Sequence, residues 1–436
     1  MGHRRATALL DGTVAAVTAA VRDQMPVGPT RDFYLWCLRP DNPGRHQFLQ
    51  IFGVNQLVRL TCQLLDGFVD DAQWPELVTH STPLGVYLTF EVVSDNLAIG
   101  VLPPDRRPTA DIQRGVLCGF NAAMVRRLTG DPRPGAELLA RQRASIARLS
   151  AYAHSLTGDA QHALARAWGG DSGARDVELD TWAVLAANID SCAYIADTMA
   201  TQHCGQLLRE GLVNRYWAVT RTLCTEFSGP PELAVLGAHS ILVAPTLAYY
   251  VIVLAERLRP NPRLRALVHD GSLDEAFYDA ALLVRLLNDI GTPLLEQPAA
   301  RHRLLSAAAA APGGLFPWLL ARAAHDVALT RLAKDLRHGE FNVALFRPRH
   351  AEADPADQVA QLVRALTYFA ALYVTHTARL RASLAAMAVR LGDATISRLI
   401  DGFVQFHRRL YAHDYTTPEG EYAIGHPVST LDRPAA

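Results

Sequence analysis

Apolar residues recur at helical spacing along almost the whole chain, and this feature most constrains the fold. In residues 138–156, 273–290 and 358–391 they fall at i, i+3, i+4 and i+7, the period of an amphipathic helix. Runs that alternate with a period of two, and Asn-Gly hairpin turns, do not interrupt this pattern. We therefore predict an all-α protein built from about ten helices.

Several helix boundaries are marked by their own residues. Pro355 follows Asp354 and suits the first position of a helix, and Ser272 with Glu275 forms a capping box. No break resembles a domain linker, so we predict one α-helical domain over residues 1–436, with an irregular tail from about residue 414. The Pro/Gly-rich breaks lie at residues 25–30, 38–45, 102–108, 130–135, 168–175, 229–231, 259–262, 311–314 and 347–355.

Composition excludes several classes of protein. Half of the 436 residues are hydrophobic and the net charge is −1, which allows a large core and argues against a nucleic-acid-binding protein. No run approaches eighteen uninterrupted apolar residues, so we expect no membrane span. The six cysteines contain no CxxC pair, which favours reduced thiols and a cytoplasmic protein. Asp11, Gly12 and Thr13 interrupt the N-terminal apolar run, which indicates an amphipathic helix instead of an export signal.

The stretch "NDIGTPLLE", residues 288–296, places oxygen-bearing side chains at regular intervals. On one helix over residues 273–296, Asn288, Thr292 and Glu296 are spaced i, i+4 and i+8. Successive members are displaced by about 40° around the axis and share one face. Amide, hydroxyl and carboxylate oxygens are the donors that Mg²⁺ accepts. The alternative is a solvent-exposed polar edge on an amphipathic helix.

The same stretch has the form Asn/Asp, Asp, aliphatic, any residue, Ser/Thr, any three residues, Glu. It resembles the second metal-binding motif of class I terpene synthases, and "FYDAALLVRLLNDI" is similar to the apolar helix that leads into it. The resemblance implies a helical bundle of the isoprenoid synthase type, with Asn288, Thr292 and Glu296 as Mg²⁺ ligands. Pro293 departs from the motif, because it cannot donate to the carbonyl of Asp289 and should kink the helix there.

The resemblance also implies an aspartate-rich motif on another helix, and no intact DDxxD occurs in the chain. Glu91 and Asp95, at i and i+4 in "FEVVSDNLAIG", are the first choice for this role, with Asp95 preferred. Asp190 and Asp197, on one face of an apolar helix, are the second choice, because buried acids need partners.

Arginine is the residue that diphosphate oxygens require. Arg285 lies one turn before Asn288, and Arg379 lies where the family places a basic residue. Residues 406–415 supply Arg408, Arg409 and Tyr411 as a second option. A carbocation also needs an apolar, aromatic-lined pocket. The candidate lining residues are Tyr87, Phe90, Tyr194, Trp217, Tyr249 and Phe277, for which plain core packing is the alternative.

The resemblance implies a Mg²⁺-dependent cyclase that ionises farnesyl or geranylgeranyl diphosphate and releases diphosphate. Asp95, Asn288, Thr292 and Glu296 would carry the ionisation, and a homodimer is left open. One alternative is head-to-head prenyl coupling of the squalene and phytoene synthase kind, with Asp66 and Asp70 as one aspartate pair. The other is a helical scaffold that binds a ligand or a protein without catalysis.

Overall fold

The computed structural model describes residues 2–102, 109–223, 227, 229–311, 313–351 and 354–412. These residues form helices and turns and contain no strand, so the prediction of an all-α protein is confirmed. The chain falls into two compact units, and its treatment as one domain stays a prediction. The tail predicted from residue 414 lies outside the described residues. Unit 1 comprises Met1–Ile99, Pro108–Trp217 and Tyr249–Pro260; unit 2 comprises Gly100–Arg107, Ala218–Ala248 and Asn261–Ala436.

In unit 1 the central helix is α10, Thr181–Thr198, whose residues are apolar on nearly every side and mostly buried. A helix that is hydrophobic all round must be enclosed by others, and α10 packs against α5 and α6. The surrounding elements are α1 Gly2–Gln24, α2 Pro29–Cys37, α3 Arg45–Ile51, α4 Val54–Leu65, α5 Trp74–Asn96, α6 Ala110–Leu128, α7 Gly135–Leu138, η1 Ala140–Gln142, α8 Arg143–Ile146, α9 Gly158–Leu179, α11 Gly205–Thr222 as far as residue 217, and η2 Val253–Leu258.

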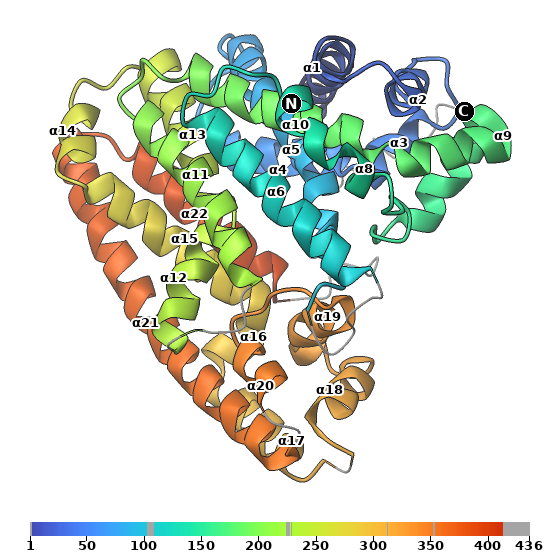
Figure 1. Cartoon of the computed structure of the whole chain (residues 1–436). Coiled ribbons are helices and arrows are strands. Elements are labelled where there is room, and N and C mark those ends of the chain that lie inside the picture. The colour runs from blue at the N-terminus through green and yellow to red at the C-terminus, as the bar shows by residue number, and fades with distance from the viewer. Residues whose placement is uncertain are drawn as a thin grey trace. The chain divides into compact units, whose positions relative to one another are not determined.

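In unit 2 the central helix is α15, Ser272–Ile290, which is also buried along most of its length. It packs against α12, α21 and α22 (Figure 1). The other elements are α12 Pro230–Ser240, α13 Val243–Ile252 as far as residue 248, α14 Leu264–His269, α16 Thr292–Glu296, α17 Pro298–Ala309, α18 Leu315–Ala323, η3 Val327–Leu329, α19 Thr330–His338, α20 Phe346–His350, α21 Pro355–Leu391 and α22 Thr395–Leu410.

Two predicted helix starts have different outcomes. Helix α21 begins at Pro355, and the Asp354 carboxylate accepts a hydrogen bond from Ala356 N at 2.9 Å, as expected for a capped start. Helix α15 does begin at Ser272, but the capping box is wrong. Asp270 accepts from both the N–H and the hydroxyl of Ser272, at 3.0 and 2.6 Å, so the preceding acid satisfies this helix end.

The helix predicted over residues 138–156 is also wrong. The segment breaks into the short pieces α7, η1 and α8, followed by turns. Ala151 N donates to the carbonyl of Glu178 at 3.1 Å, and the Ser150 hydroxyl contacts the Glu178 carboxylate. These bonds to the end of α9 replace the bonds that a continuous helix would make within the segment.

Helix α12 ends at Ser240 and α13 begins at Val243, so the chain breaks between the two. Among the helices that the structure describes, none is by itself long and apolar enough to cross a membrane. One pair, residues 230–240 with residues 243–258, meets that test jointly and is bent by 42° at its break.

Candidate functional site

The motif "NDIGTPLLE" does not lie on one helix, which corrects the sequence prediction. Helix α15 ends at Ile290, and α16 starts at Thr292. Gly291 between them has φ +88°, a conformation that glycine adopts at little cost. Pro293 then occupies the first turn of α16, where no N–H is required. The i, i+4, i+8 arrangement over Asn288, Thr292 and Glu296 is therefore absent.

This break leaves backbone carbonyls at the end of α15 without helical donors, as expected where a proline follows. Side chains from later in the chain replace those donors. Arg331 Nε donates to Asn288 O at 2.7 Å, and Asn342 Nδ2 donates to Asp289 O at 2.8 Å. The predicted kink at the Asp289 carbonyl is thus stabilised by a side-chain amide.

The Asp289 side chain is fully buried and serves as an internal anchor. It accepts from Arg285 Nε at 3.0 Å and from Val343 N at 2.8 Å. Burial raises the pKa of Asp289 to about 6, with Asp335 adding to the rise and Arg285 opposing it. Arg285, a predicted diphosphate ligand, is itself buried and forms an ion pair with Asp289.

The three oxygen donors of the motif have partners in unit 2. Asn288 Oδ1 accepts from Arg331, and the Thr292 hydroxyl donates to Arg408 O at 2.7 Å. Glu296 accepts from both Arg408 Nε and Arg408 Nη2, at 2.6 and 2.7 Å.

The donor set can be tested against a divalent cation. Amide, hydroxyl and carboxylate oxygens are the chemistry that Mg²⁺ prefers. Guanidinium groups hold two of these donors, Asn288 and Glu296, so positive charge already stands at their oxygens. The donor chemistry therefore fits a hard cation, and Arg408 is the guanidinium that must withdraw for a cation to reach Glu296. Within the described part of the chain, no group of three or more His, Cys, Asp or Glu side chains is arranged to hold a metal ion.

The remaining predicted diphosphate ligands, Arg379, Arg409 and Tyr411, have different surroundings. Arg379 Nε donates to the buried carboxylate of Asp279 at 2.7 Å, and His376 Nδ1 lies 2.7 Å from the same carboxylate. Arg409 is exposed on α22. The ring of Tyr411 lies 4.6 Å from the guanidinium carbon of Arg331, and Tyr411 O accepts from Thr292 N.

Unit 1 contains the predicted acidic pair Glu91 and Asp95, on α5. Glu91 is buried and accepts from Asn188 Nδ2 at 2.9 Å, Tyr216 Oη at 2.8 Å and Arg215 Nη2 at 3.3 Å. Burial raises the pKa of Glu91, and Asp95 raises it further. Asp95 shares Arg215 at 2.5 Å, but its side chain is 58% exposed. Of this pair, only Asp95 has a side chain that is accessible to solvent.

The second-choice acids, Asp190 and Asp197, both have partners as well. Asp190 Oδ1 accepts from Gly135 N at 2.8 Å, and burial raises the pKa of Asp190. Asp197, which is half exposed, pairs with Arg209 at 2.7 Å. Asp190 thus fixes the start of α7, and Asp197 lies on the surface.

The predicted pocket residues divide into two groups. Tyr87, Phe90, Tyr249 and Phe277 are almost completely buried, as ordinary core residues are. The other two, Tyr194 and Trp217, are 51% and 52% exposed.

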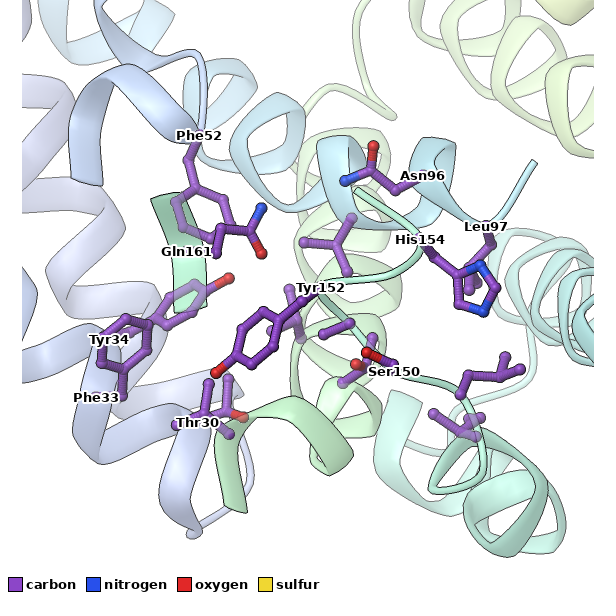
Figure 2. A pocket seen from close by; sticks show the side chains of 17 residues that line it. Thr30, Phe33, Tyr34, Phe52, Asn96, Leu97, Ser150, Tyr152, His154 and Gln161 are labelled. Carbon is purple, nitrogen blue, oxygen red and sulfur yellow. The ribbon is translucent and has the colours of Figure 1, made fainter. Parts of the chain in front are cut away.

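Unit 1 contains a small, partly open cavity that none of these six residues lines (Figure 2). Its volume is about 40 Å³, enough for roughly three water molecules. Its lining includes the aromatic residues Phe33, Tyr34, Phe52 and Tyr152, together with Thr181. This cavity is too small for an isoprenyl chain.

Sequence reasoning missed several partners of the site. Arg331, Asn342 and Arg215 were not singled out, and Arg408 was only a second option. Each lies far along the chain from the residue it contacts: 43 residues separate Asn288 from Arg331, and 124 separate Glu91 from Arg215. No local spacing rule connects such pairs. The only available indication was that a buried acid requires a donor.

Among solved structures, a cucumene synthase variant is similar to this chain. The similarity covers 85% of this chain and 96% of the other, at 13% identity and a TM-score of 0.39. No family model and no curated protein match the chain.

Proposed function

We propose that this chain is a class I terpene synthase that ionises an allylic isoprenyl diphosphate, farnesyl or geranylgeranyl diphosphate, and cyclises the resulting cation. One observation carries the proposal. Around the break between α15 and α16, Asn288 accepts from Arg331, the Thr292 hydroxyl donates to the Arg408 carbonyl, and Glu296 accepts from the Arg408 guanidinium. Departure of a diphosphate requires cationic groups of this kind.

Asn288, Thr292 and Glu296 would hold Mg²⁺, which when bound supplies Lewis-acid stabilisation of the leaving group. Of the two acids on α5, we keep Asp95 as the candidate metal ligand, because its side chain is exposed. Glu91 already accepts several hydrogen bonds.

The chain's own residues would bind and orient the substrate. Arg408 is half exposed, so its planar fork can meet two phosphate oxygens at once. Arg331 is 4% exposed and its Nε is bonded to the Asn288 carbonyl, so it holds Asn288 in place. Tyr373 donates to Glu296 Oε1 at 2.9 Å and fixes the orientation of that carboxylate.

Release of diphosphate from farnesyl and geranylgeranyl diphosphate tests the proposal. We expect release that depends on Mg²⁺, accompanied by a hexane-soluble product formed from one substrate molecule. Asn288→Ala and Glu296→Gln should each abolish turnover in a folded protein. Asp357→Asn, on the exposed start of α21, is the matched control and should retain activity. Full activity in both site variants would remove the assignment.

A non-catalytic binding scaffold is the second candidate, and the pairing of Asn288 and Glu296 with arginines favours it. Such a scaffold would release no diphosphate from either substrate. Head-to-head coupling would require a second aspartate pair besides Asp66 and Asp70, and the sequence offers none at the expected spacing. Coupling would also yield a product from two substrate molecules, which mass spectrometry distinguishes.

A further inference from the structure

Two arginines hold the oxygens of the motif, but they differ sharply in exposure to solvent. Arg331 is almost fully buried, with its Nε on the Asn288 carbonyl and its guanidinium over the Tyr411 ring. Arg408 has a side chain that is 45% exposed, and its guanidinium contacts Glu296 at the surface. An exposed guanidinium leaves its partner at a small cost, whereas a buried one does not.

The backbone of Arg408 is nevertheless fixed in place. The Thr292 hydroxyl donates to Arg408 O, and Thr292 N donates to Tyr411 O three residues later. Glu296 is held separately by Tyr373. The guanidinium of Arg408 can therefore swing away while both its own backbone and the Glu296 carboxylate stay where they are.

We propose that Arg408 is an exchangeable counter-ion, which occupies Glu296 when the site is empty and transfers to the diphosphate when a divalent cation takes Glu296. The inference rests on the proposed function and deepens it. In the exchange, one carboxylate–guanidinium pair is replaced by a carboxylate–metal pair and a guanidinium–phosphate pair, so no charge is left unpaired. Metal and diphosphate then assist each other's binding, because each releases the group that the other needs.

Two single substitutions test the exchange, with Mn²⁺ and inorganic diphosphate each titrated alone against the full chain by calorimetry. Arg408→Gln removes the competitor of the metal, so we expect Mn²⁺ to bind about fivefold more tightly and diphosphate to bind more weakly. Glu296→Gln removes the competitor of the phosphate, so we expect the opposite: tighter diphosphate and weaker Mn²⁺. Arg364→Gln, an exposed arginine of α21, is the matched control and should change neither affinity.

The reciprocal signs separate exchange from a merely structural pair. If the Arg408–Glu296 contact only supports the fold, both substitutions should weaken both ligands or leave them unchanged, and this result would overturn the inference. When the wild-type chain also releases diphosphate from farnesyl diphosphate, such a result refutes the exchange and leaves the proposed function standing. Absence of Mn²⁺ binding in the wild type and in Arg408→Gln alike refutes both the exchange and the metal assignment.

Discussion

Each unit contains a pair of acidic residues in which one side chain is buried and the other, called here the outer acid, is more exposed. In unit 1, Glu91 is buried at 2% exposure and Asp95 lies outside it on the same helix. In unit 2, Asp289 is buried at 0% exposure and Glu296 lies outside it on the next helix. Both buried acids are held by amide or hydroxyl donors as well as by an arginine.

The two pairs differ in how they use arginine. Glu91 and Asp95 share Arg215, so neither can change its partner without affecting the other. Asp289 pairs with Arg285, and Glu296 pairs with Arg408. Separate arginines allow the outer acid of unit 2 to exchange partners while the buried acid stays anchored. This difference makes unit 2 the better candidate for a ligand-responsive site.

The largest expected effect follows from the shared arginine. Arg215→Met leaves Glu91 buried without a cation, so we expect a loss of about 3 kcal/mol in the free energy of unfolding. Urea denaturation followed by circular dichroism measures this loss. Asp95→Asn is the matched control and should cost less than about 1 kcal/mol, because Asp95 is mostly exposed. Equal losses in the two variants would show that Arg215 serves only the outer acid.

A smaller effect is expected at the buried acid of unit 2. Asp289→Asn should destabilise the chain by about 2 kcal/mol, because donors to the carboxylate lose an acceptor. The size of this loss in unfolding free energy should depend on pH. The pKa of Asp289 is raised from 3.8 to about 6 by burial, so its contribution to stability is fully present below 3.8 and is lost as the pH rises through about 6.

The difference in unfolding free energy between wild type and Asp289→Asn should therefore shrink as the pH rises from 4 to about 6. Urea titrations at several pH values measure it, and a difference that grows with pH would contradict the raised pKa. The comparison with wild type at each pH removes the contribution of titrating groups that do not interact with Asp289.

The sequence predicted well those elements whose identity is determined locally. The apolar period placed α15 and α21 correctly, and Asp354 with Pro355 marked the start of α21. It failed where distant contacts override local preference. Residues 138–156 have helical spacing, yet their backbone bonds to Glu178.

The motif shows the same limit within nine residues. Pro293 indicated a disturbance at Asp289, but Gly291 and Pro293 together end one helix and start another, and this result depends on Asn342 and Arg331. The spacing of Asn288, Thr292 and Glu296 could therefore suggest ligands without giving their geometry. Arg408, 112 residues from Glu296, could be chosen only by analogy.

The smallest expected loss of unfolding free energy is at the outer acid of unit 2. Its dependence on pH is opposite to that of the buried acid. Glu296→Gln should cost less than about 1 kcal/mol, because its partner Arg408 is half exposed and solvent screens the pair. The hydrogen bonds from Arg408 lower the pKa of Glu296, so its contribution to stability is present above 4.5 and is lost as the pH falls through the lowered value. The difference from wild type should thus grow as the pH rises, which is the reverse of Asp289→Asn. The same urea titrations measure both variants. If the two differences changed with pH in the same direction, the buried and outer acids would not have oppositely shifted pKa values.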